Sequence, residues 1–187
     1  MLNLATKDSL QLAVDLADSS VCLHINGIRI HRSKIRSFDQ GKFFGSMPGI
    51  QVAGILSRPL RITREYATIV KMPVVERHAP KDTLEAATNA WKPDTLIQRP
   101  AFLLLETEYG IDLIFEQEGE AGMRDDWMKF SFFSKICWRR SLESIGNYFT
   151  FSRQEYHPRI IMQIPARDLR AIYRALPREA YVVLRIY

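Results

Sequence analysis

The sequence predicts an α+β fold, an antiparallel sheet built from hairpins with three to four helices packed on it. Two observations indicate hairpins: apolar stretches reverse direction at Asn26-Gly27 and again at Tyr109-Gly110. A third indicates a helix, because residues 166–176 carry apolar side chains at helical spacing. Strands and helices do not alternate regularly, so a doubly wound parallel sheet is not expected.

The first hairpin spans residues 21–32, with Asn26-Gly27 favouring a two-residue type I′ turn. That loop length sets the expected cross-strand pairs: Ile25–Ile28, His24–Arg29, Leu23–Ile30, Cys22–His31 and Val21–Arg32. Because side chains alternate along a strand, one face would be apolar and the other polar. The apolar, core-facing side would hold Val21, Leu23, Ile25, Ile28 and Ile30; the polar side would hold Cys22, His24, Arg29 and His31.

The elements around this hairpin follow from apolar spacing and from turn residues. Before it, Asp8 or Ser9 can cap a helix that continues to about Asp18. After it, the three glycines and the proline of 33–49 indicate a loop. Strands are then expected at 50–56 and 60–71, and a helix at 81–91.

The second half of the chain begins with the hairpin that turns at Tyr109-Gly110. Residues 128–138 are apolar nearly all round, so periodicity leaves open whether they form a helix or a strand. The remaining expected elements are strands at 147–152 and 159–164, a helix at 166–176 and a terminal strand at 178–187. We expect one domain over residues 1–187, with a division near 93–100 as the alternative.

Composition excludes several classes of protein. An apolar fraction of 47% and a charged fraction of 25% are those of an ordinary folded domain. No apolar run approaches the roughly 18 residues that a membrane span needs, and the N-terminal residues do not resemble a secretory signal. Cys22 and Cys137 lie far apart, which indicates neither a disulfide framework nor a cysteine-based zinc site. We expect a cytoplasmic protein that has no cofactor and binds no membrane.

Catalytic motifs are missing from the sequence, so we favour binding over catalysis and predict no catalytic residue. Asp112 and Glu116 could share one strand face and begin a metal site, as in a metal-dependent phosphodiesterase or nuclease, which is the second alternative. Cys22, His24 and His31 could also supply metal ligands. The cation of Arg29 opposite His24 would oppose a metal ion, so no metal site is predicted.

The basic residues give the leading hypothesis, a nucleic-acid-associated binding protein. The net charge is +5, and arginine outnumbers lysine 9 to 1 in residues 131–187. Arginine binds phosphates with two parallel hydrogen bonds, which suits nucleic acid. The predicted nucleic-acid-binding residues are Arg29, Arg32, Lys34, Arg36, Arg167, Arg170 and Arg174.

The first alternative is a protein-interaction module, such as an inhibitor or accessory subunit, which could self-associate as a homodimer. Charge is distributed unevenly, with 11 acidic and 5 basic residues in 81–130 between two basic ends. A cluster of aromatic residues could stack on bases, but we expect core packing instead. Its members are Trp127, Phe130, Phe132, Phe133 and Trp138.

Overall fold

The computed structural model describes residues 10–41, 56, 58–71, 100–119, 122–148, 158–177 and 180–186. The first strands are β1 (Leu10–Asp15), β2 (Ser20–Ile25), β3 (Ile28–Lys34), β4 (Ser37–Asp39) and β5 (Leu60–Ala67). They are followed by β6 (Phe102–Thr107), β7 (Asp112–Gln117), helix α4 (Met123–Tyr148), β8 (Arg159–Ile164), helix α5 (Ala166–Ala175) and β9 (Tyr181–Arg185). The expected strand 50–56 and helix 81–91 lie outside the described residues, apart from Leu56.

Within these residues the strands form one nine-stranded sheet in the order β3-β2-β1-β9-β5-β6-β7-β8-β4. The sheet is mixed, because β9 is parallel to β1 and β8 is parallel to β7, while the other neighbours are antiparallel. The predicted fold class is therefore wrong on two counts: the sheet is not purely antiparallel, and the described part of the chain has two helices rather than three to four.

One of the expected helices is in fact the strand β1. Leu10, Leu12, Val14 and Leu16 are spaced two residues apart, which places them on one face of a strand. Leu12, Val14 and Leu16 are buried in the main core; all of β1 pairs with β2, and its residues Gln11–Asp15 also pair with β9. The period of two therefore decided the structure of this segment, whatever capping Asp8 or Ser9 could have offered.

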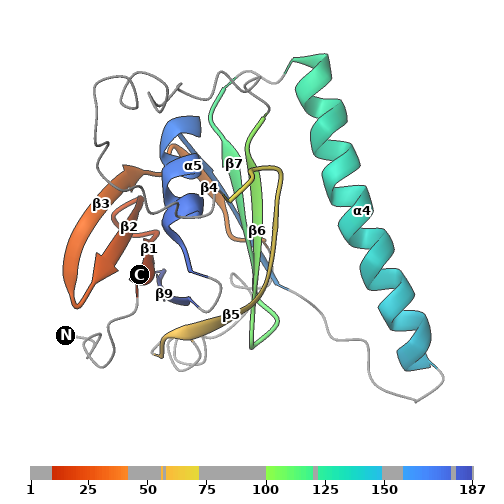
Figure 1. Cartoon of the computed structure of the whole chain (residues 1–187), viewed down its shortest axis with the longest axis horizontal. Coiled ribbons are helices and arrows are strands. Elements are labelled where there is room, and N and C mark those ends of the chain that lie inside the picture. Colours follow the sequence, from red (N-terminus) through yellow and green to blue (C-terminus); the bar gives the residue numbers. More distant parts are fainter. Residues whose placement is uncertain are drawn as a thin grey trace, which may run out of the picture.

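The sheet curls round helix α5, as Figure 1 shows. The segment that holds β3 and β4 connects the two ends of the curled sheet. Its first strand, β3, pairs with β2, and its second strand, β4, pairs with β8. Ile35 lies between them and is buried, and the backbone N–H of Arg36 donates to Gln163. The apolar stripe of α5, Leu169, Ile172 and Tyr173, fills the interior together with Leu176, as its helical spacing predicted.

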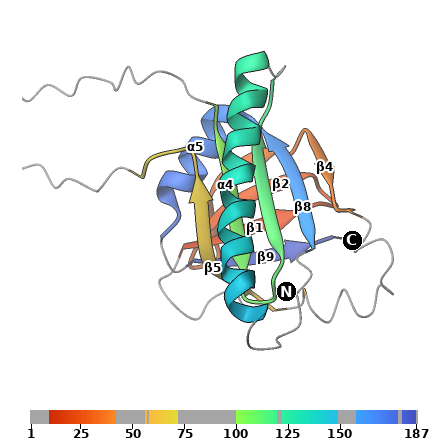
Figure 2. The same cartoon turned by 90° about the vertical axis from the view of Figure 1, so that its right-hand side faces the viewer.

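Helix α4 lies on the outer face of β6 and β7, opposite the face that covers α5 (Figure 2). Phe102, Leu104 and Glu106 of β6 stand opposite Glu116, Ile114 and Asp112 of β7, so these six side chains share the face beneath α4. A second, smaller core forms there from Leu104, Ile114 and Ile136, with Phe132 and Phe133 packed against it. The segment 128–138, which periodicity left open, is thus helical throughout.

The β2–β3 hairpin has the predicted turn but a different register. Asn26 and Gly27 both have positive φ, 52° and 79°, as a type I′ turn requires. A β-bulge after the His24–Arg29 pair shifts the register, so Leu23 pairs with His31 and Val21 with Ser33. The expected pairs Leu23–Ile30, Cys22–His31 and Val21–Arg32 are therefore wrong. Ile28 and Ile30, expected in the core, are 70% and 51% exposed.

Candidate functional site

Four of the predicted nucleic-acid-binding residues come from the β3–β4 run. Arg29, Arg32 and Lys34 stand opposite His24, Cys22 and Ser20, on the face of β3 turned away from α5. Arg32 forms an ion pair with Asp18. Arg36, beyond the buried Ile35, lies 3.1 Å from a carboxylate oxygen of Glu118. Arg32 and Arg36 therefore each have a carboxylate partner within the chain.

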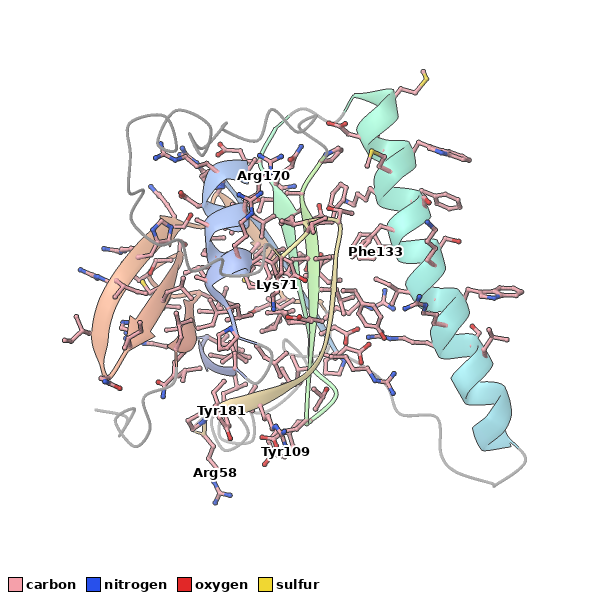
Figure 3. All side chains as sticks on the ribbon, viewed as in Figure 1. Arg58, Lys71, Tyr109, Phe133, Arg170 and Tyr181 are labelled. Carbon is pink, nitrogen blue, oxygen red and sulfur yellow. The ribbon has the colours of Figure 1, made fainter. Side chains whose placement is uncertain are left out.

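The other three predicted residues lie on α5, where Arg167 and Arg174 are exposed and Arg170 is half-buried. Asp168 of the same helix binds β3: the hydroxyl of Ser33 donates to its Oδ2 over 2.7 Å, and Nε2 of His31 lies 3.7 Å from its Oδ1. Arg170, labelled in Figure 3, lies near the middle of α5. The two groups of predicted residues are thus on neighbouring elements, but β3 presents its basic side chains on the face opposite α5.

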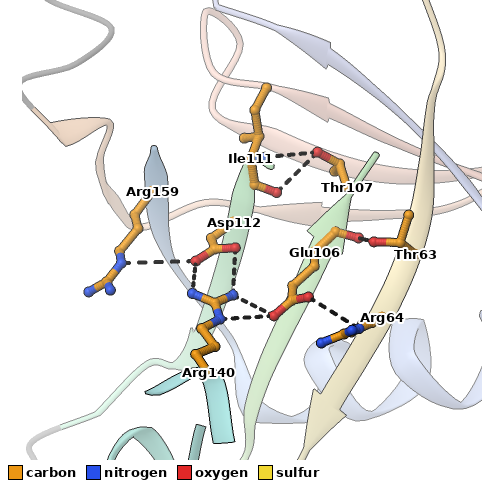
Figure 4. A network of polar contacts seen from close by, with 8 residues as sticks. All are labelled: Thr63, Arg64, Glu106, Thr107, Ile111, Asp112, Arg140 and Arg159. Carbon is orange, nitrogen blue, oxygen red and sulfur yellow. Dashed lines mark hydrogen bonds and ion pairs between the residues drawn. The ribbon is translucent and has the colours of Figure 1, made fainter. Parts of the chain in front are cut away.

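The candidate carboxylates Asp112 and Glu116 lie beneath α4 and are paired with bases. Asp112, which is 0% exposed, accepts hydrogen bonds from Nη1 and Nη2 of Arg140 over 2.7 and 2.8 Å. The same guanidinium donates through Nε to Glu106 over 3.1 Å, as Figure 4 shows. Glu116 accepts from Lys129 of α4 over 2.7 Å.

Arg140 and Lys129 of α4 thus neutralise the carboxylates of the strands beneath the helix. Burial by itself would lower the pKa of Arg140, but its hydrogen bonds with Asp112 and Glu106 raise it above the ordinary value. The guanidinium therefore stays charged and occupies the oxygens that a divalent cation would need. Sequence spacing could not reveal this, because Arg140 is 28 residues from Asp112 along the chain.

The cysteine and histidines of the hairpin do not converge. Cys22 and His24 belong to the outer face, whereas His31 faces α5. In the described part of the chain no group of three or more Cys, His, Asp or Glu residues could hold a metal ion. Burial lowers the pKa of His24 below 6.5, and the charge of Arg29 lowers it further, so this imidazole favours the neutral form.

The most unusual surface is the side of α4 that faces away from the sheet. We call it the outer stripe and define it as Met123, Trp127, Phe130, Ser131, Ser134, Trp138 and Leu142. Trp127, Phe130 and Trp138 are 70%, 66% and 69% exposed. The expectation that all five aromatic residues are core is therefore wrong for these three. Phe132 and Phe133 do pack against the second core, where both side chains are partly buried.

The outer stripe follows from the helical repeat. Residues 127, 130, 134, 138 and 142 are three or four apart, so they lie along one side of the helix. The indole of Trp127 and the ring of Phe130 are 6.0 Å apart. Beside Trp138, a shallow, open hollow is lined by Ser134, Lys135, Trp138 and Arg139 of the same helix. None of the elements that the structure describes lies over this side of α4 (Figures 1 and 2).

The sequence does contain a signal for this surface. A helix that is apolar nearly all round is normally buried, whereas among the described residues α4 packs against the sheet with one side only. The apolar residues on its other side therefore form the exposed outer stripe.

Comparison of the chain with models of protein families, with curated proteins and with solved structures found no match. Among the described residues, no helix is both long and apolar enough to cross a membrane.

Proposed function

We propose that the chain is a protein-interaction module that binds its partner through the outer stripe of α4. The observation that supports this most strongly is the exposure of Trp127, Phe130 and Trp138 on one side of one helix. Exposing large apolar side chains to water is unfavourable, and contiguous exposed patches usually mark binding sites. Aromatic residues and methionine are also the types most enriched in the centres of protein interfaces.

The way α4 is attached to the sheet supports the same proposal. Arg140 and Lys129 bind buried carboxylates of β6 and β7, and Phe132, Phe133 and Ile136 pack between these two polar contacts. The inner side of the helix is thus fixed by several contacts. A rigid helix presents its outer side in one conformation, which reduces the entropy that is lost on binding.

A photoreactive phenylalanine analogue in place of Phe130 tests the proposal. Irradiation of the full chain, alone and in an extract of the cells from which it comes, should give a defined protein adduct. The matched control carries the analogue at Ile28, which is equally exposed but lies at the tip of the β2–β3 hairpin. Loss of the adduct when Trp138→Glu is added would support the proposal; equal labelling from both positions would contradict it.

Nucleic-acid binding through the seven predicted basic residues stays a second proposal, and the arginines of α5 give it the clearest support. It is supported by Arg167 and Arg174, which are exposed and carry no ion pair with the residues that the structure describes. Binding of a random oligonucleotide should weaken steeply as salt rises and should be reduced in the Arg167→Ala/Arg174→Ala variant. Affinity that does not depend on salt would exclude it.

A cytoplasmic location belongs to the same set of proposals. It is supported by the two cysteines, which are both free thiols in different settings: Cys22 is buried in the hairpin and Cys137 is exposed on α4. Such thiols are typical of a reducing compartment.

A further inference from the structure

We propose that the protein bound by the outer stripe is a second copy of this chain, joined by antiparallel pairing of two α4 helices. This inference rests on the proposed function above and adds the identity of the partner. The hollow beside Trp138 would receive Trp127 of the other copy, and the twofold symmetry of the pair would create this contact twice.

The order of residues in the outer stripe reads almost the same from both ends. Met123 and Leu142 are equally far from a midpoint between residues 132 and 133, and so are Trp127 and Trp138. With a rise of about 1.5 Å per residue, the two pairs lie roughly 14 Å and 8 Å from that midpoint. An antiparallel copy therefore sets Met123 level with Leu142 and Trp127 level with Trp138.

The centre of the stripe allows two helices to approach closely. Ser131 and Ser134 lie on either side of the midpoint and are the smallest residues of the stripe. The distance between packed helices depends on the side chains at their crossing point, and small ones bring the axes to the short end of the range. Trp127 and Trp138 lie on either side of this narrow centre, where the side chains of the two copies can interdigitate.

The hollow and the facing residue match in position and in chemistry. The hollow is lined by Ser134, Lys135, Trp138 and Arg139, so its level on the helix is that of Trp138. In the antiparallel pair Trp127 of the other copy arrives at this level. Its indole then meets the ring of Trp138 and the cations of Lys135 and Arg139, which can stabilise it through ring stacking and cation–π contacts.

The area of the stripe suits a dimer of moderate strength. Large aromatic side chains offer roughly 150–250 Å² each, so three rings at two-thirds exposure supply roughly 300–500 Å² per copy. Met123 and Leu142 bring this total closer to the about 800 Å² per partner that a standard interface buries. We therefore expect a dimer that dissociates on dilution.

Sedimentation of the purified full-length chain over a wide concentration range tests whether the dimer exists. We expect a monomer–dimer equilibrium in which Trp127→Glu raises the dissociation constant by at least about 30-fold, as for a central aromatic contact. Ile28→Glu, an equally exposed apolar position away from α4, should leave the constant unchanged. Circular dichroism must show that both variants are folded.

Cysteine cross-linking in a Cys137→Ser background tests the orientation. Ser134→Cys, near the twofold axis, should form a disulfide-linked dimer rapidly. Met123→Cys alone should not, because antiparallel pairing separates it from its own copy by roughly 28 Å along the helix. A mixture of Met123→Cys and Leu142→Cys chains should cross-link, and self-linking of Met123→Cys would overturn the antiparallel geometry.

The outcomes separate this inference from the proposed function. A chain that stays monomeric at all concentrations, yet forms the Phe130 adduct with a different protein, would overturn the second copy and leave the interaction module standing. A monomer that gives no adduct, or only a cross-link within its own chain, would overturn both.

Discussion

The side chain of Arg140 attaches helix α4 to two strands of the sheet. Its guanidinium binds Asp112 of β7 and Glu106 of β6 from helix α4, so it connects three elements and neutralises two buried acids. Both carboxylates are almost fully inaccessible to water. Removing the cation would leave them buried without their principal counter-charge, which is one of the most costly changes that a single substitution can make.

We therefore expect Arg140→Met to lower the free energy of unfolding by about 3 kcal/mol. Urea denaturation of both proteins at neutral pH measures the difference. Arg159→Met is the matched control, because its guanidinium also lies near Asp112, with Nε 3.9 Å from Oδ2, but is 57% exposed. The control should lose less than about 1 kcal/mol. Equal losses would show that the network around Asp112 does not stabilise the attachment of α4.

At the scale of the element, the β2–β3 hairpin shows that a correctly predicted turn does not fix the register of its strands when a bulge follows it. The Asn26-Gly27 turn is confirmed, yet one extra residue in β3 places His31 and Ser33 on the core side. On the turn side of the bulge the predicted register holds and sets His24 opposite Arg29 on the outer face. This cross-strand pair joins an imidazole to a cation, so its energy depends on pH.

The hairpin should therefore lose stability as the solution becomes acidic. The folded protein holds the pKa of His24 below 6.5, so the unfolded chain binds the proton more readily. The stabilisation is complete above pH 6.5 and decreases as pH falls from there through the pKa of the folded state. NMR titration should show a low His24 pKa that rises only part of the way to 6.5 in Arg29→Gln, because burial is the larger cause.

Substituting His24 by Asn assigns the signal and removes this component of the pH dependence. An unchanged pKa in Arg29→Gln would mean that the guanidinium has no influence on the ring. A His24 pKa above 6.5 in the natural sequence would contradict the expectation altogether.

Local sequence patterns were sufficient for some elements and insufficient for others. The helix at 166–176 and the strand at 159–164 are confirmed, because amphipathic spacing and flanking prolines report directly on local structure. The turn at Tyr109-Gly110 is confirmed for the same reason: Gly110 has a φ of 72°. β1 was mistaken for a helix, since weight was given to capping residues when the apolar residues alternate every second position.

The candidate site was less predictable than the elements. Which aromatic residues of α4 are buried depends on the side that meets β6 and β7, and no local pattern specifies it, because both sides are apolar. The pairing of Asp112 with Arg140 is likewise a long-range contact. The assignment of the seven basic residues to nucleic acid stays a prediction.

At the scale of the whole molecule, the order of strands is what the sequence concealed. β9 lies between β1 and β5, and β8 lies between β7 and β4, so both parallel neighbours join segments that are distant in the chain. Hairpin signals report only on consecutive strands. They therefore suggested an antiparallel sheet built from hairpins, and the insertion of β9 and β8 between distant strands could be recognised only in three dimensions.

The parallel pairing of β1 and β9 has a mechanical consequence. A tensile force applied at the first residue of β1 and the last residue of β9 pulls two parallel neighbours in opposite directions along their length. The hydrogen bonds that connect Gln11–Asp15 to Tyr181–Arg185 then bear the load together in shear. Handles at Leu10 and Ile25, which face each other at one end of the antiparallel β1–β2 pair, would peel the bonds apart one after another. Optical tweezers should record a higher rupture force for the first geometry, and equal forces would exclude such a clamp.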